Sequence, residues 1–147
     1  MKLDAPHSTD TLTTWLDYWG HVHVTGIDLG LERVIPVAEK LGVMQPEAKV
    51  FTVAGTNGKG STTTTLATIL NAQGYKVGLY QSPHLYRFNE RVKLAGHEVD
   101  DQRLVDAFVC VDQARRECGL RLSFFEATTL AAFVIFKPQQ CDFWVLE

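Results

Sequence analysis

A glycine-rich loop holds the residues of this chain that are best suited to chemistry. It consists of Gly55, Thr56, Asn57, Gly58, Lys59, Gly60 and Ser61. Glycines let backbone N–H groups approach a phosphate closely, and the start of a following helix adds donors that have no intrahelical partner. The Lys59 ammonium would reach the outer phosphates of a bound nucleotide. The pattern therefore predicts a phosphate-binding loop, and the alternative is an ordinary glycine turn before a helix.

The loop departs from the common phosphate-loop pattern G-x-x-x-x-G-K-[ST] at two positions. Val53 occupies the place of the first glycine, and Gly60 stands where Ser or Thr usually follows the lysine. The hydroxyl arrives one residue later, at Ser61, and four threonines follow it. Threonine is a poor helix former, so these hydroxyls suit a first turn that faces a ligand or caps backbone groups.

Three apolar segments are expected to form buried strands that position the loop. They are residues 49–54, 75–81 and 141–147. If the strands are parallel, their C-terminal ends share one sheet edge, where α/β proteins bind ligands. The loop, Ser82 and Glu147 would meet there, and their oxygens together with nucleotide phosphates suit Mg²⁺. The alternatives are that Ser82 only begins a turn before Pro83 and that Glu147 is a solvated chain end.

The remaining pattern alternates helices with strands and predicts an α/β fold, with a parallel sheet and flanking helices. Gly20 should end a first helix, and Asp28 should cap a second one that stops at Gly42. Residues 91–94 and 97–99 read as a hairpin around Ala95-Gly96. Further helices are expected from residue 61 to Gly74, from Asp100 or Asp101 to about residue 118, and over 124–136.

Composition narrows the class of protein. The chain has 147 residues, a net charge of −3 and 46% hydrophobic residues, which is globular and lacks the basic excess of a nucleic-acid binder. No apolar run reaches the roughly 18 residues of a membrane span, and the first ten residues lack the apolar core of a secretory signal. The spacing of Cys110, Cys118 and Cys141 predicts free thiols in a reducing cytoplasm and no zinc site.

Several motifs resemble those of a known group of enzymes. Ala54 to Ser61 is similar to the phosphate loop of the Mur ligase superfamily, including the glycine after the lysine. The folate branch of that superfamily, the dihydrofolate synthase/folylpolyglutamate synthase family, is indicated by four further stretches. These are Ile27-Asp28-Leu29-Gly30-Leu31-Glu32-Arg33-Val34, Ser82-Pro83-His84-Leu85, Arg87-Phe88-Asn89-Glu90-Arg91-Val92 and Phe125-Glu126.

The resemblance implies an ATP-dependent ligase that adds L-glutamate to dihydropteroate or folates through an acyl phosphate. It implies that Gly55 to Ser61 bind ATP with Lys59 as the catalytic cation, and that Ser82 and Glu147 ligate Mg²⁺. The pterin side would be contacted by Ile27, Asp28, Ser123, Phe124, Phe125 and Glu126. Asp28 as a helix cap and the two phenylalanines as core residues are the alternatives.

Three other residues stay open at this point. His84 is either a ligand or a turn residue, and Arg87 and Arg91 meet substrate anions or solvent. The competing functions are a cell-wall Mur ligase and a nucleotide-binding module without ligase activity. We expect a helical segment over 1–48 and part of an ATP-binding domain over 49–147, from a cytoplasmic monomer without nucleic-acid or membrane partners.

Because the sequence stops within an apolar run, we expect it to be an N-terminal portion whose C-terminal domain is missing. We expect the third strand to be an exposed sheet edge. The isolated chain should then neither turn over ATP nor fold stably.

Overall fold

The computed structural model describes residues 4–22 and 30–147. These divide into two compact units, each built from two stretches of the chain. One comprises Met1–Gln45 and Asp101–Ile135, and we call it the helical unit; the other comprises Pro46–Asp100 and Phe136–Glu147, and we call it the sheet unit. The predicted functional division at residue 48 stays a prediction.

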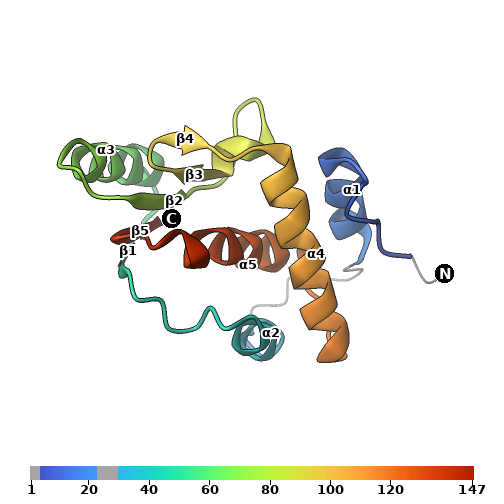
Figure 1. The fold of residues 1–147 in the computed structure, drawn as a ribbon. Coiled ribbons are helices and arrows are strands. Elements are labelled where there is room, and N and C mark those ends of the chain that lie inside the picture. Colours follow the sequence, from blue (N-terminus) through green and yellow to red (C-terminus); the bar gives the residue numbers. More distant parts are fainter. Residues whose placement is uncertain (1–3, 23–29) are drawn as a thin grey trace. The chain divides into compact units, whose positions relative to one another are not determined.

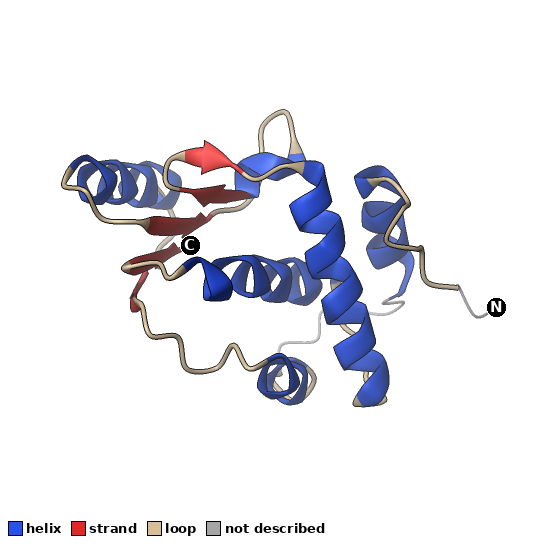
Figure 2. Ribbon diagram, in the orientation of Figure 1, coloured by secondary structure: helices blue, strands red, loops and turns tan. Residues whose placement is uncertain are grey.

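The sheet unit contains five strands in the order β1-β5-β2-β3-β4 (Figure 1; red in Figure 2). β5 pairs in parallel with both β1 and β2, while β3 runs antiparallel to β2 and to β4. The parallel arrangement of the three apolar segments and the hairpin are therefore confirmed. The strands are β1 (Lys49–Thr52), β2 (Val77–Tyr80), β3 (Val92–Leu94), β4 (His97–Glu98) and β5 (Phe143–Leu146).

The strand order corrects two expectations. β5 lies between β1 and β2, with Trp144 and Val145 buried, so the third apolar segment is not a sheet edge. β1 is the edge instead, and all four of its residues are exposed, including Val50 at 43% and Phe51 at 41%. The expectation of a buried first strand was wrong because an apolar run indicates a strand without specifying how many neighbours it has.

Helix α3 (Lys59–Ala72) covers one face of this sheet. Its Ala67 packs with Val77, Leu79 and Val145 in a buried cluster. On the other face the Phe136 ring lies against Gly78 and 5.6 Å from the ring of Trp144. Gly78 has room for no side chain, because a Cβ there would come within 2.8 Å of the Phe136 ring.

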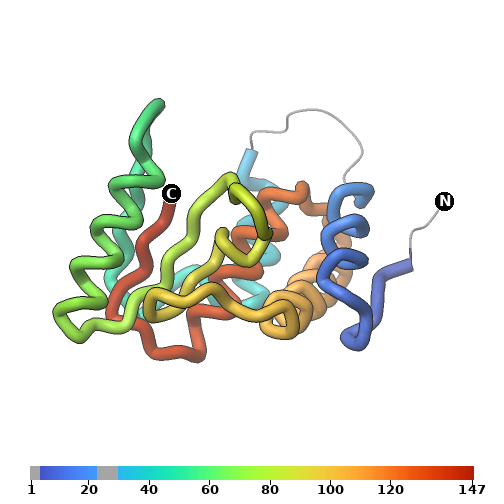
Figure 3. The backbone as a smooth tube through the Cα atoms, turned by 90° about the horizontal axis from the view of Figure 1, so that it is seen from above, coloured from blue at the N-terminus to red at the C-terminus, as the bar shows by residue number. Residues whose placement is uncertain are grey.

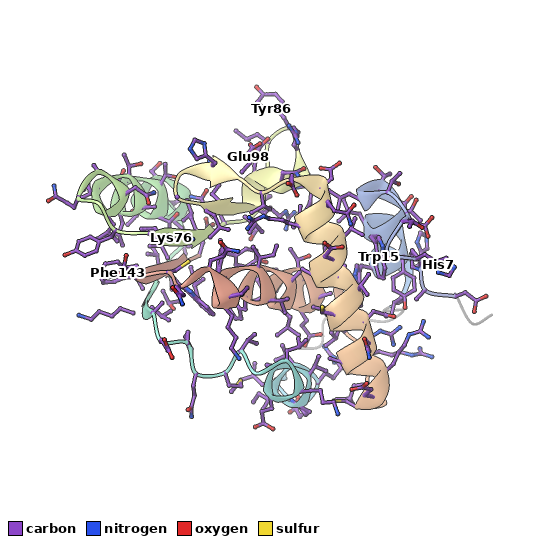
Figure 4. All side chains as sticks on the ribbon, in the orientation of Figure 1. His7, Trp15, Lys76, Tyr86, Glu98 and Phe143 are labelled. Atoms are coloured by element: carbon purple, nitrogen blue, oxygen red, sulfur yellow. The ribbon has the colours of Figure 1, made fainter. Side chains whose placement is uncertain are left out.

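The helical unit contains α1 (Leu12–Val22), α2 (Val34–Leu41), α4 (Asp101–Glu117) and α5 (Phe124–Phe136), whose last residue belongs to the sheet unit. α1 lies beside α4, and Trp15 and Trp19 of α1 pack around Phe108 of α4. Figure 4 labels Trp15, whose indole N–H donates to the His7 carbonyl at 3.0 Å. In the part of the chain that the structure describes, no helix is long and apolar enough to span a bilayer.

Two helix boundaries differ from the predictions. α1 continues through Gly20 to Val22, because the burial of Trp15 and Trp19 outweighs the roughly 1 kcal/mol that a helical glycine costs. α2 begins only at Val34, with Arg33 at the position before it; Asp28, the predicted cap, lies outside the described residues. The predicted end at Gly42 is confirmed, since this residue adopts the left-handed conformation with φ 71°.

Candidate functional site

The glycine loop connects β1 to α3 as predicted. Gly58 precedes the first helical residue with φ 72°, a left-handed conformation that strongly favours glycine. The Lys59 ammonium folds back over the loop and donates to the Gly55 carbonyl at 2.6 Å. Residues 54–58 are exposed, so the loop backbone is open to a ligand. This is the arrangement that phosphate binding at a helix N-terminus requires.

The threonine run has a mixed role. Thr63 is fully buried and its hydroxyl lies within hydrogen-bond distance of the Lys59 and Gly60 carbonyls, at 3.0 and 3.1 Å. Ser61 and Thr62 are exposed on the same turn. Thus the Thr63 hydroxyl bonds back to carbonyl groups of the preceding turn, while Ser61 and Thr62 are exposed.

The ends of the three parallel strands meet at one sheet edge. Figure 3 shows the chain end at Glu147 and the loops that follow β1 and β2 on the same side of the sheet unit. The Glu147 N–H donates to the Tyr80 carbonyl at 3.0 Å, which extends the β5–β2 pairing to the last residue. Its carboxylate Oε2 lies 3.8 Å from where a Cβ on Gly60 would stand. Glu147 therefore points toward the start of α3.

Ser82 directly follows the last paired residues of β2 and is half-buried, with a cis bond to Pro83. Among the residues that the structure describes, no three His, Cys, Asp or Glu side chains gather at metal-binding distance. A cation at this edge would therefore take one carboxylate, one hydroxyl, and phosphate or water oxygens. That all-oxygen set fits Mg²⁺, which usually keeps several waters and binds substrate phosphates.

The loop from Ser82 to Arg91 contains the three residues left open by the sequence. Arg91 donates through Nε to His84 Nδ1 at 2.9 Å and lies over the Phe88 ring, 5.3 Å from its centroid. Both side chains thus help to build the loop. Arg87 is exposed and precedes a 3₁₀ turn, η1 (Phe88–Arg91).

Glu90 organises the tip of this loop, a role that sequence reasoning missed. Its carboxylate accepts the backbone N–H groups of Leu85, Tyr86 and Arg87 at 2.9, 2.8 and 2.7 Å. These hydrogen bonds, that of Leu85 first, hold the pKa of Glu90 below its usual value. Leu85 and Tyr86 are left 85% and 90% exposed, and Figure 4 shows Tyr86 pointing away from the ribbon. The Asn-Glu-Arg-Val motif includes Glu90, but the sequence alone did not indicate what its carboxylate binds.

In the helical unit, Ser123 and Glu126 form the N-terminal cap of α5. Ser123 Oγ accepts the Glu126 N–H at 3.1 Å, and Glu126 Oε1 accepts the Ser123 N–H at 2.9 Å. This reciprocal capping box could have been read from the Ser-x-x-Glu spacing. Phe125 is 52% exposed, so it is not a core residue in this unit, whereas Phe124 is half-buried.

Arg33 is the second partner of Glu126. It donates to Oε1 through two nitrogens, at 2.8 and 3.2 Å, and both side chains are largely buried. Burial pushes the pKa of Glu126 upward, but the Ser123 N–H and Arg33 outweigh it and leave that pKa lowered. The predicted pterin residues Ile27 and Asp28 lie outside the described residues.

Comparisons with known proteins agree on one group of relatives. The chain is 48% identical to the dihydrofolate synthase/folylpolyglutamate synthase of Escherichia coli over 143 residues, 97% of this chain and 33% of that protein. The solved structure of E. coli FolC in complex with DHPP and ADP matches with a TM-score of 0.93, covering 97% of this chain and 34% of that one. Models of known protein families give no match.

A second solved structure gives the same result. It is a bifunctional folylpolyglutamate synthase/dihydrofolate synthase with Mn, AMPPNP and L-glutamate bound, 44% identical with a TM-score of 0.91, matched over 98% of this chain and 34% of that one. The chain thus spans about a third of the length of the relatives that it matches. Nearly the whole of this chain is therefore similar to about a third of a dihydrofolate synthase/folylpolyglutamate synthase.

Proposed function

We propose that the protein carrying this chain is an ATP-dependent ligase that adds L-glutamate to dihydropteroate, to folates, or to both. The observation that carries the proposal is the convergence of the Lys59 loop, Ser82 and Glu147 at the ends of β1, β2 and β5. The ADP, AMPPNP, Mn and L-glutamate bound to the relatives support the same assignment.

The proposed reaction has two steps. A substrate carboxylate oxygen attacks the γ-phosphorus of ATP, ADP leaves, and an acyl phosphate forms. The amino nitrogen of L-glutamate then attacks the acyl carbon, inorganic phosphate leaves with the electron pair of the broken C–O bond, and the nitrogen loses a proton. The first step moves a highly charged group, so it needs positive charge and aligned N–H donors around the transferring phosphoryl.

The residues of this chain supply that environment. Gly55 to Ser61 would hold the phosphates with their backbone N–H groups, and the Lys59 ammonium would exchange the Gly55 carbonyl for a phosphate oxygen. Ser82 and Glu147 would hold Mg²⁺, which when bound neutralises phosphate charge. Ile27, Asp28 and Ser123 to Glu126 would contact the pterin, with Arg33 fixing the Glu126 carboxylate.

The test is phosphate release by the full-length protein with ATP, Mg²⁺ and dihydropteroate, with and without L-glutamate. We expect release to depend on glutamate, and Lys59→Ala to lower it about 100-fold or more, as for loss of a group that stabilises transition-state charge. Lys49→Ala, on the exposed edge strand, is the matched control and should remain active. Release without glutamate would favour a nucleotide-binding module, and activity with a UDP-muramyl peptide would favour a cell-wall ligase.

We also propose that the protein is a cytoplasmic monomer whose partners are its small-molecule substrates. The ligands bound in the solved relatives support the small-molecule partners. Sedimentation of the purified full-length protein would reveal a larger assembly, and fractionation of cells would reveal another location.

A further inference from the structure

Gln81 links the end of β2 to the beginning of α3. Its backbone N–H donates to the Arg91 carbonyl at 2.9 Å, which fixes the residue in the sheet. Its side-chain Nε2 lies 3.1 Å from the Gly60 carbonyl and 2.7 Å from the hydroxyl oxygens of both Thr63 and Thr64. One amide group therefore meets three acceptors in the first two turns of the helix that carries Lys59.

The Gln81 side chain acts as a hydrogen-bond donor in all three contacts. An amide nitrogen has two protons, so Gln81 serves two of the three acceptors at a time. Thr63 spends its own proton on the carbonyl of Lys59 or Gly60, so its oxygen is left to accept from Gln81. Because Thr63 is fully buried, losing this donor would leave a buried oxygen with one partner fewer.

The two ends of this link are the two halves of the proposed site. Gln81 is covalently followed by Ser82, the proposed metal ligand from β2. Gly60 is covalently preceded by Lys59, and the Glu147 carboxylate lies beside it. The amide therefore ties the residue that precedes Ser82 to the helix that carries Lys59.

We propose that Gln81 is a positioning residue that couples divalent-metal binding to nucleotide binding in this site. It would touch neither the metal nor the reacting atoms, and it would act by holding Ser82 in register with the first turn of α3. This inference rests on the proposed function, since it assumes a metal–nucleotide complex at this sheet edge. The alternative is that these hydrogen bonds only stabilise the packing of β2 against α3 and do not affect ligand binding.

The test uses the full-length protein with AMPPNP as the nucleotide probe, titrated in the calorimeter with saturating Mn²⁺ and again in EDTA. Gln81→Met keeps the length of the side chain and removes both donors. We expect its AMPPNP affinity to fall about five- to tenfold with Mn²⁺, the effect of one neutral hydrogen bond or slightly more, and to stay within about twofold in EDTA. Gln73→Met, the same change at the exposed far end of α3, is the control.

A second variant removes a partner instead of the donor. Thr64→Val lies on an exposed position, so the fold should survive it. Alone it should weaken Mn²⁺–AMPPNP binding less than about twofold, because Gln81 keeps two other acceptors. Combined with Gln81→Met it should add nothing, since the donor is already gone.

The outcomes distinguish the coupling role of Gln81 from a purely structural role and from failure of the proposed function. Equal losses with Mn²⁺ and in EDTA, or no loss at all beside a merely lowered melting temperature, would overturn the coupling role of Gln81 and leave the proposed ligase intact. If the unaltered protein bound AMPPNP equally well with and without Mn²⁺, the metal site would fall, and with it this inference. If it bound no AMPPNP, the proposed function would fail first.

Discussion

Replacing Gly78 by alanine should destabilise the sheet unit. Gly78 lies in β2, and a Cβ added to it would stand 2.8 Å from two carbons of the Phe136 ring and 3.0 Å from a third. Carbon atoms pack favourably at about 3.5–4.0 Å, so the ring would have to retreat by roughly 0.5–1 Å. Phe136 is fully buried and its ring packs against Trp144, so it cannot retreat without displacing other core atoms.

The magnitude follows from two opposing contributions. An extra methyl group in a well-packed core usually costs about 1–3 kcal/mol. Alanine restricts the unfolded chain more than glycine does, which returns about 0.4–1 kcal/mol. We therefore expect a net loss of about 1–2 kcal/mol in the free energy of unfolding. For a domain of this size, that lowers the melting temperature by roughly 2–8 °C.

Calorimetry and urea unfolding of the full-length protein, followed by tryptophan fluorescence, measure the change. Gly20→Ala is the matched control, because no atom lies within 4 Å of a Cβ there and helix propensity should raise stability by up to about 1 kcal/mol. Phe136→Leu should cost less in the Gly78→Ala protein than in the unaltered one. An unchanged or higher melting temperature for Gly78→Ala would refute the steric argument.

Four further predictions concern charged groups and caps. Asp112→Asn should cost about 3 kcal/mol in thermal unfolding, because the buried Asp112 accepts from Tyr18, Arg115 and Arg116. Burial, and then the hydrogen bond to Asp112, raise the pKa of Tyr18 above 10.0, which absorbance titration of the phenol would show. The stability that the protonated Tyr18 contributes should be present below pH 10.0 and lost as pH rises through the raised pKa. Glu90 has a lowered pKa, so its hydrogen bonds should keep the loop ordered above pH 4.5 and be lost as pH falls through that pKa. Hydrogen exchange of the Tyr86 amide would measure this loss, and Glu90→Gln should cause the same loss at neutral pH. Ser123→Ala should cost about 1 kcal/mol, measured by urea unfolding, through loss of the α5 cap.

The parallel strands and the glycine loop could be predicted because their signals are local. A β-branched apolar run, a glycine turn and a following helix stand next to one another in the chain, and strands that run in the same direction have their C-terminal ends at one sheet edge. Strand order is not local. The runs 49–54 and 141–147 are both mostly apolar, so this pattern alone did not show which strand would have two neighbours and which only one.

The side-chain partners of the site were also hidden by distance along the chain. Arg33 reaches Glu126 across 93 positions, and Gln81 reaches Gly60 across 21. Arginine and glutamine suit exposed surfaces as well as such contacts, so the residue type alone did not indicate these partners. The exception is the Ser123–Glu126 cap, which spans three positions and has a known spacing.

The central place of β5 has a consequence for how the protein is made. β1 and β2 do not pair with each other, and the strand that must lie between them is the last of the five to be translated. At 5–20 residues per second, the ribosome needs about 5–20 s to add the roughly 90 residues that separate β1 from β5. During that interval the nascent chain carries unpaired apolar strands, of which only β2 can be satisfied early, by its hairpin with β3. We therefore expect chaperone occupancy on the nascent chain to begin after β1 emerges and to drop sharply once Leu146 has cleared the exit tunnel.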